Sequence, residues 1–260
     1  MSPTAWSWSP DAIVAPLLLA GYLVALARSD AEGDGRRRQR LWAFGGGVVL
    51  VGVALASPLD TLAREYLVWA HLLQNVVLAE WAPALLVLGL PPWLAAALTR
   101  SAPARFLTRP VVALPLWLVT YAVWHVPALY DAALANPSWL LPIEHLTYLA
   151  VGILVWWPVI HAAPHDLPSG GRAAYVFAAF VASAPLGLLL ALLPSPVYDA
   201  YVDAPERLWG LSRLTDQQLG GVTMAGEQSI VFFAVFAHWF LRFLADEDLR
   251  GAPPSGRPHG

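Results

Sequence analysis

The sequence predicts an all-α polytopic membrane protein, built as a bundle of seven transmembrane helices. Three observations predict it. Of the 260 residues 58% are hydrophobic, only 13% are charged, and apolar stretches near the length of a spanning helix recur along the chain. Soluble domains have about a quarter of their residues charged. Lipid offers no hydrogen-bond partners to the backbone, so the spanning segments are expected to be helices.

Seven segments have the length and polarity of spanning helices. Their interiors contain almost no ionised side chains, and the two short ones, the first and the second, are completed by flanking residues. Proline occurs inside five of them, which a membrane bundle tolerates where neighbouring helices satisfy the freed carbonyls. In chain order the predicted spans are Asp11–Ala27, Leu41–Ala56, Leu67–Leu90, Val111–Val126, Ile143–His161, Ala173–Leu193 and Gln218–Leu244.

The chain shows no internal domain boundary. Residues 1–245 are therefore predicted to form a single transmembrane domain. Residues 246–260 read DEDLRGAPPSGRPHG, which is polar and rich in proline and glycine. Such a composition cannot bury enough apolar surface to fold, so this segment is predicted to be a disordered cytoplasmic tail.

Arginine placement predicts the orientation, because cytoplasmic loops carry an excess of basic residues. Three arginines, Arg64, Arg207 and Arg213, lie on one side of the predicted bundle, and the other twelve lie on the opposite side. The arginine-rich side is expected to be cytoplasmic. The N-terminus is then outside, and seven spans place the C-terminus inside.

The composition also limits the chemistry. Cysteine is absent, so the chain has no disulfide and no thiolate metal ligand. Any bound metal would need histidine, methionine or carboxylate ligands. No hydrolase motif or nucleotide-binding loop stands out in the sequence. The RRRQR run at Arg36–Arg40 is interpreted as a topology signal, and no nucleic-acid partner is expected.

Three histidines from consecutive spans fall at one depth. His71, His125 and His145 lie at the outer ends of the third, fourth and fifth predicted spans, whereas His161 and His238 lie toward the inner side. Imidazole is a common ligand for copper, zinc and iron. The pattern predicts a shared metal site at the outer face. It is also compatible with three separate histidines that each bind a loop carbonyl.

The segment HLLQN places His71, Gln74 and Asn75 on one helix face, because side chains three and four residues apart are neighbours. This polar face is expected to point into the bundle, either to support the metal site or to form hydrogen bonds between helices. Glu80 lies nine residues after His71, on roughly the opposite face and near mid-membrane. A protonated carboxyl group or a partner on another helix is expected there.

Other polar residues flank the predicted spans. Asp60 follows the second span in a turn, SPLD, and Asp216 and Gln217 open the seventh span, where Asp216 is placed to cap the helix. Met224 lies about two turns further on. Its thioether suits Cu(I), although most buried methionines only pack.

The ordered motifs resemble a known family. They are SPLDTLA, AHLLQNVVLAEWAPALLVLG, WHVPALYDAAL, IEHLTYLAVGILVWWPVI, YDAY and LTDQQLGGVTM. Together they resemble the CtaG family, the membrane-integral assembly factors for cytochrome c oxidase of the caa type. The resemblance runs from Ser57 to Met224. It implies a seven-helix membrane protein of the bacterial inner (plasma) membrane.

The resemblance also implies a function. Members of this family are non-enzymatic maturation factors that work with cytochrome c oxidase subunits, acting as chaperones that handle copper for the heme–copper centre near its outer side. One position differs: the family often has a second histidine four residues after the first, where this chain has Asn75, a poor copper ligand. The positions that match the family are His71, Gln74, Trp124, His125, Asp131, Glu144, His145, Asp216 and Gln217.

Two other functions stay open from the sequence. A membrane b-type cytochrome needs axial histidines, but His145 and His161 are separated by about 160° around their helix, which places them on nearly opposite faces. A transporter of small solutes or metals is allowed by Glu80 and by the proline-broken helices, although no internal repeat supports it. The oligomeric state is also open, a homo-oligomer included.

Overall fold

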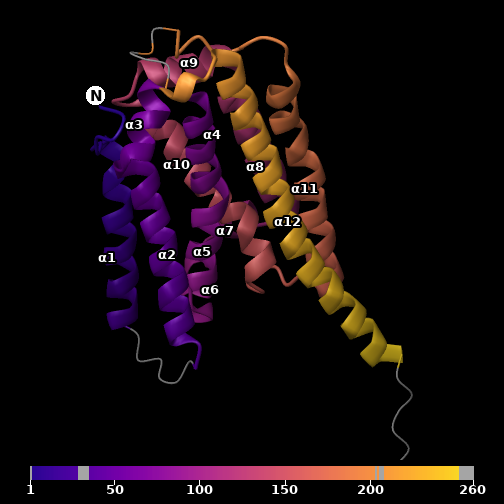
Figure 1. Ribbon diagram of the computed structural model, residues 1–260. Coiled ribbons are helices and arrows are strands. Elements are labelled where there is room, and N and C mark those ends of the chain that lie inside the picture. Colours follow the sequence, from indigo (N-terminus) through magenta and orange to yellow (C-terminus); the bar gives the residue numbers. More distant parts are fainter. Residues whose placement is uncertain (1, 29–34, 203, 205–207, 252–260) are drawn as a thin grey trace, which may run out of the picture.

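The computed structural model describes residues 2–28, 35–202, 204 and 208–251, and no strand occurs in these parts of the chain. Long helices run side by side along a common axis (Figure 1), which confirms the all-α class. The helices are η1 (Pro10–Ile13), α1 (Val14–Ala27), α2 (Arg37–Ala56), α3 (Pro58–Glu65), α4 (Val68–Val76), η2 (Val77–Trp81), α5 (Ala82–Gly89), α6 (Pro92–Leu98), α7 (Ala102–Leu107), α8 (Pro110–Trp124), α9 (Pro127–Ala135), α10 (Leu140–Ile160), α11 (Ser169–Leu192), η3 (Leu208–Gly210) and α12 (Arg213–Gly251).

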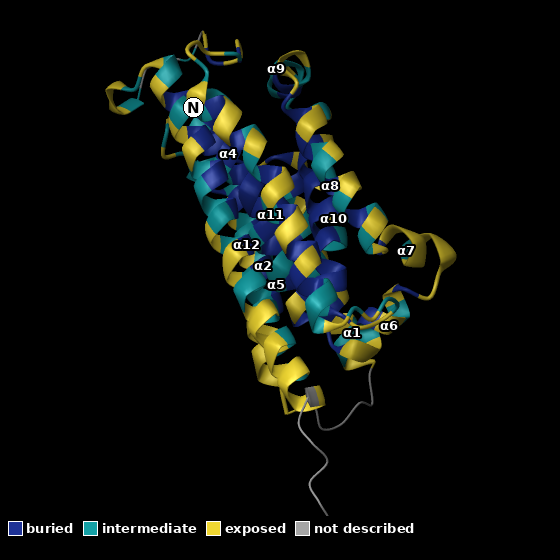
Figure 2. Cartoon of the chain, turned by 90° about the vertical axis from the view of Figure 1, so that its right-hand side faces the viewer, coloured by how far each residue is buried: buried dark blue, intermediate teal, exposed yellow. Residues whose placement is uncertain are grey.

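Six continuous helices are long and apolar enough to cross a membrane, and the bent pair of α8 and α9 brings the number to seven if it forms one span. The outside of the bundle is apolar as well. Figure 2 shows buried residues along the axis and exposed ones on the outside, and the exposed side chains include many large hydrophobic residues that water would disfavour. The chain is therefore a multi-pass membrane protein. The continuous spans are Pro10–Ala27, Arg37–Ala56, Val68–Gly89, Leu140–Ile160, Ser169–Leu192 and Arg213–Arg250.

The fourth predicted span, Val111–Val126, differs most from the structure. Helix α8 has 15 residues, a length of about 22 Å, which is shorter than a hydrocarbon core of about 30 Å. Proline at position 127 disfavours helical backbone in the residue before it, and Val126 is extended, with φ −63° and ψ 121°. The chain bends by 74° there, and α9 lies across the end of the bundle (Figure 1).

The last helix, α12, is longer than the predicted Gln218–Leu244. Its 39 residues span about 58 Å, and its end projects past the rest of the bundle (Figure 1). Residues 246–251 are helical, so the predicted disordered tail is wrong for this stretch. The rest of that tail, residues 252–260, lies outside the described residues.

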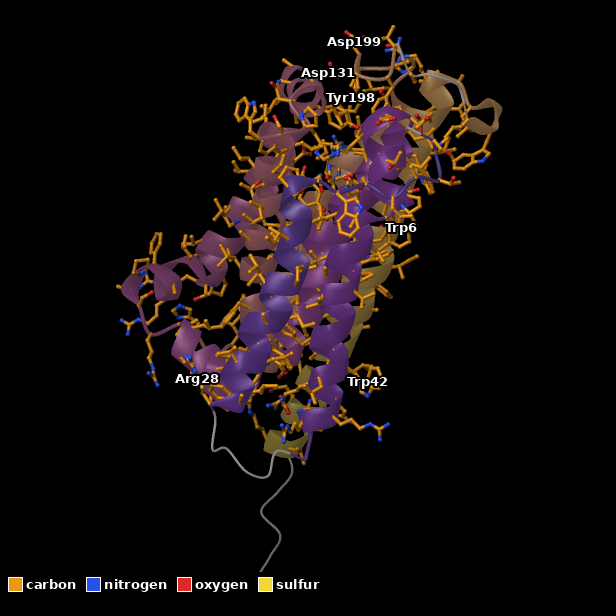
Figure 3. All side chains as sticks on the ribbon, turned by 90° about the vertical axis from the view of Figure 1, so that its left-hand side faces the viewer. Trp6, Arg28, Trp42, Asp131, Tyr198 and Asp199 are labelled. Carbon is orange, nitrogen blue, oxygen red and sulfur yellow. The ribbon has the colours of Figure 1, made fainter. Side chains whose placement is uncertain are left out.

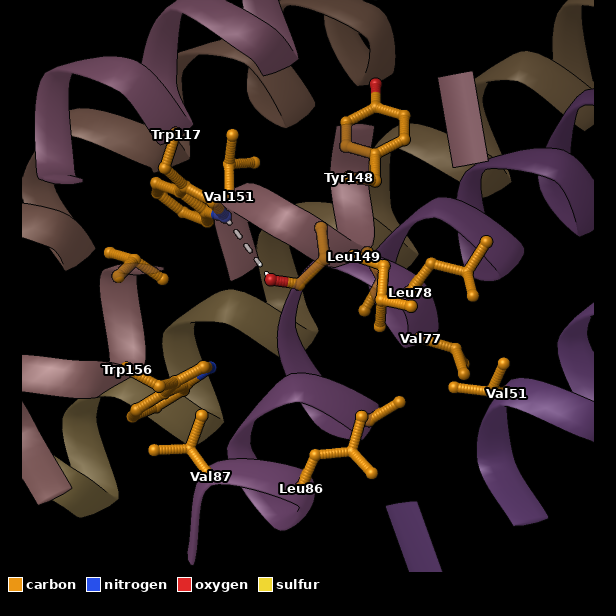
Figure 4. Close-up of a cluster of buried hydrophobic side chains, with 14 of the residues drawn as sticks. Val51, Val77, Leu78, Leu86, Val87, Trp117, Tyr148, Leu149, Val151 and Trp156 are labelled. Carbon is orange, nitrogen blue, oxygen red and sulfur yellow. Dashed lines mark hydrogen bonds between the residues drawn. The ribbon is translucent and has the colours of Figure 1, made fainter. Parts of the chain in front are cut away.

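The segment α4–η2–α5 is the most buried of the spans and packs against α2, α10 and α12. Its middle turn, η2, is a π-helix just before Pro83, which has no N–H and whose ring crowds the carbonyl of Ala79. Neighbouring indoles bind the carbonyls of this turn. Trp117 Nε1 donates to Ala79 O at 3.4 Å (Figure 4), and Trp156 Nε1 donates to Glu80 O at 2.9 Å.

Candidate functional site

The polar side chains predicted from the sequence gather at one end of the bundle, which we call the N-terminal end. It carries the N-terminal segment, α3 and α9 (Figure 1). Trp6, Asp131 and Tyr198 lie toward this end, whereas Arg28 and Trp42 lie at the opposite end (Figure 3).

His71 and Glu144 form the centre of the cluster. His71 Nε2 lies 3.1 Å from Glu144 Oε1, and the same oxygen accepts a hydrogen bond of 3.1 Å from Asn75 Nδ2. All three side chains are at most 1% exposed. His71 and Asn75 are one helical turn apart, so both side chains reach the carboxylate of Glu144 from the same face of the helix. Asn75 therefore helps to orient Glu144.

His145 binds a carboxylate from the other end of the sequence. Its Nδ1 lies 2.6 Å from Oδ2 of Asp11, which opens the first span within η1. Two further hydrogen bonds hold this N-terminal segment on the bundle, from Ser9 Oγ to Leu55 O at 2.8 Å and from Thr61 Oγ1 to Ala5 O at 3.0 Å. The role of Asp11 was not predicted from the sequence. Its only signal was a carboxylate at the start of an apolar span.

His125 follows α8 at the bend. Its Nδ1–H donates to the carbonyl of Tyr121 at 2.8 Å. Aromatic rings cover the cluster: Tyr130 packs on His71, with ring centroids 4.8 Å apart, and Tyr198 stacks on Tyr130 at 3.8 Å. Burial raises the pKa of Tyr198, so this phenol stays neutral and contributes only polar and apolar contacts.

Each of the three imidazoles keeps one ring nitrogen without a partner. These atoms are His71 Nδ1, His125 Nε2 and His145 Nε2, and Glu144 Oε2 is also unpartnered. Metal-binding histidines in proteins usually have this form, with one nitrogen held by a carboxylate or carbonyl and the other free for the metal. Within the described residues, however, no three His, Asp or Glu side chains are grouped closely enough to hold a metal ion.

Gln74 and Asp60 connect α2, α3 and α4. Gln74 Nε2 donates to Asp60 Oδ1 at 2.9 Å and to the carbonyl of Ala54 at 2.7 Å. Asp60 also pairs with Arg64 at 3.5 Å. Gln74 therefore points into the bundle, as predicted, and it fixes the helix that carries His71.

Asp216 caps a different helix from the one predicted. It lies within the first turn of α12, and its two oxygens each accept a 3.0 Å hydrogen bond, from the backbone N–H of Val68 and of Trp69. These N–H groups open α4 and have no partners within their own helix. The carboxylate also complements the positive end of the α4 dipole.

Gln217 holds a loop by a hydrogen bond, and Met224 packs in the apolar core. Gln217 Oε1 accepts from the backbone N–H of Val197 at 2.8 Å and so holds the loop that follows α11. Met224 is 1% exposed and lies in the apolar core, where it lines a cavity with Trp117 and Gln228. The structure thus gives Met224 packing contacts deeper in the bundle, apart from the contacts that hold the imidazoles.

Glu80 has partners on two other helices, as expected for its position near mid-membrane. Its Oε1 accepts from Tyr121 Oη at 2.8 Å and from Gln228 Nε2 at 2.7 Å. A second carboxyl group, Glu227 of α12, accepts from the indole N–H of Trp81, the residue that follows Glu80. Glu227 was not predicted as a site residue, because no local sequence pattern connects it to Glu80.

The fold and this site define a multi-pass helical membrane protein with a buried histidine–carboxylate cluster at one end. The chain matches the model of a family described as cytochrome c oxidase caa3 assembly factor, Caa3_CtaG, over residues 20–246. It belongs to this family, which confirms the resemblance found in the motifs. Neither a curated protein nor a solved structure gives a match to the chain.

Proposed function

We propose that the chain is a non-catalytic copper chaperone, which holds copper transiently at its N-terminal end during assembly of a caa3-type cytochrome c oxidase. The membership in the assembly-factor family supports the oxidase as partner. The copper role rests on one observation: His71, His125 and His145 each have one ring nitrogen oriented by a neighbour and one without a partner.

The geometry favours a carrier over a permanent metal centre. Carboxylates behind His71 and His145 make the free imidazole nitrogens better ligands. No ready group of three acidic or histidine ligands exists among the described side chains, so copper would bind only after the imidazoles move together. A protein that must pass its cargo to a partner benefits from such a weakly preorganised site.

Access to the imidazoles would require the N-terminal segment to move. All three histidines are at most 6% exposed, and the bond from Asp11 to His145 closes the site from this side. The segment also makes hydrogen bonds from Ser9 and to Ala5, and η1 packs against α2 and α10. Opening the segment would therefore break these contacts together with the bond to His145.

The orientation also belongs to this proposal. The described arginines at the end opposite the histidines include Arg28, Arg36, Arg40 and Arg172, whereas Arg64 and Arg213 lie near the N-terminal end. By the positive-inside rule, the histidine cluster faces the outside of a bacterial plasma membrane. The bent pair of α8 and α9 then completes seven spans.

Copper binding by the purified protein tests this function. Wild-type protein is expected to bind Cu(I) stoichiometrically, and the His71→Ala/His145→Ala variant is expected to lose most of this binding, because two of the three free imidazole nitrogens are removed. His238→Ala, which removes an imidazole from α12 outside the cluster, should bind like wild type. Wild-type binding no greater than that of the double variant would contradict the copper role.

A b-type cytochrome has less support. His161, which follows the last residue of α10, donates from Nε2 to the carbonyl of Val87 at 2.9 Å. Burial lowers the pKa of its imidazole, so the ring is neutral, and this nitrogen is occupied by a hydrogen bond. The cavity of about 450 Å³ beside it contains no second histidine in its lining. The site lacks the facing pair of imidazoles that heme ligation requires.

A further inference from the structure

Glu80 and Glu227 place two carboxyl groups together in the middle of the bundle. Glu80 lies in the π-turn η2 and is fully buried, and Glu227 comes from α12. Two crossed contacts bring the carboxyl groups close together: Trp81, next to Glu80 in sequence, donates to Glu227, and Gln228, next to Glu227, donates to Glu80. We call these two groups the carboxyl pair. Neither takes part in the histidine cluster.

The surroundings of the carboxyl pair are neutral. Tyr121 of α8 and Gln228 of α12 donate to Glu80 Oε1, and the indole N–H of Trp81 donates to Glu227 Oε1. Among the described residues no arginine or histidine forms an ion pair with either carboxyl group. The elements around the pair add the indole of Trp156 from α10 and apolar side chains from α2.

This environment cannot hold two negative charges. An ionised carboxylate in the membrane interior is costly, and two in contact without a cation also repel each other. One proton between the two groups leaves a single negative charge. The hydroxyl, amide and indole donors already in place are suited to stabilise that one charge.

Unpartnered oxygens mark where the proton belongs. Glu80 Oε2, Glu227 Oε2 and Gln228 Oε1 are buried and have no donor, and Gln228 is itself fully buried while its Nε2 points at Glu80. A cavity of about 460 Å³ between α8, α11 and α12 reaches Tyr121 and Gln228. Most of its lining is apolar, and Tyr121 and Gln228 are the two side chains of the lining that donate to Glu80.

We propose that Glu80 and Glu227 form a proton-binding site in the middle of the membrane. The ligand is one hydrogen ion, taken from water and shared between the two carboxyl groups, and it returns to water on release. This site shares no residue with the proposed copper site. It is supported by the closeness of the two carboxyl groups, the neutral donors around them and the buried oxygens that have no donor.

Infrared spectroscopy of the purified protein in lipid nanodiscs at neutral pH tests this site. Wild type is expected to show a carboxylic-acid C=O stretch that moves to lower frequency in D2O. The isosteric variant Glu80→Gln/Glu227→Gln should lack this band. The control Glu247→Gln, which removes an exposed carboxylate of the same helix, should leave it in place.

The single variants Glu80→Gln and Glu227→Gln keep the test decisive if the double variant does not fold. Each removes one partner of the shared proton, so each should move or abolish the band. A wild-type spectrum without a carboxylic-acid band would overturn the proposal. A carboxylic-acid band that is unchanged in both single variants would also overturn it. So would carboxylate bands in wild type that shift when a metal cation is added, because they would show ionised groups that bind a metal.

Discussion

At the scale of single residues, long-range partners decide what each polar side chain does. Asp216 shows this most clearly, since it begins one span and satisfies the backbone of another, 148 residues away in sequence. The same holds for His145, whose partner Asp11 is 134 residues away. Both contacts fix the end of the bundle where the histidines lie.

Replacement of Asp216 by alanine is expected to destabilise the protein by about 1–3 kcal/mol, because it leaves one buried and one partly buried N–H group of α4 without acceptors. Thermal unfolding in detergent would measure this as a lower Tm. Asp216→Asn retains one acceptor oxygen and should lose less. A Tm equal to wild type for Asp216→Ala would show that these N–H groups find another partner.

At the scale of elements, the central span depends on close approach to its neighbours. Gly152 of α10 lies against the π-turn, where an added Cβ would meet Ala79 O at 2.4 Å and Pro83 Cγ at 2.5 Å. The lack of a side chain lets the two helices touch backbone to backbone. This contact also brings Trp156 of the same helix to the carbonyl of Glu80.

Gly152→Ala is therefore expected to cost about 1–3 kcal/mol through overpacking. Gly45→Ala in α2 is the matched control, since nothing lies within 4 Å of its added Cβ, and it should stabilise the helix by about 0.5–1 kcal/mol. Chemical or thermal unfolding in one detergent would compare the two. Equal effects of both substitutions would contradict the packing argument.

At the scale of the whole molecule, orientation decides which compartment the histidine cluster serves. The chain has no cysteine, so single cysteines can report on sidedness without background. Ser138 is exposed in the loop between α9 and α10 at the N-terminal end, and Ser101 is exposed before α7 at the opposite end.

In intact cells, a membrane-impermeant maleimide is expected to label Ser138→Cys and not Ser101→Cys, because the arginine-rich end is cytoplasmic in the proposed topology. After the membrane is permeabilised, both should be labelled. The reverse pattern would place the histidine cluster in the cytoplasm and would contradict delivery of copper from the outside.

The sequence by itself determined the class of fold, the family and one face of the site. The length of an apolar stretch and its lack of charged residues can be seen from neighbouring residues in the chain. These two features therefore predicted six of the spans near their positions in the structure. The spacing of His71, Gln74 and Asn75 likewise follows from helix geometry alone. The bend at Pro127 could have been read from the rule for residues before proline, but the length of the segment favoured a straight span.

Only the tertiary structure decided which polar groups meet. The partners of His71, His145 and Glu80 lie on other helices. The periodicity of apolar residues predicts which face of a helix is buried, but it does not predict which helix packs against that face. In a membrane bundle many apolar packings are nearly equivalent, whereas each buried polar group must find a specific donor or acceptor. The pairings of Asp11 with His145, Asp216 with the start of α4, and Glu80 with Glu227 therefore became visible only in the folded chain.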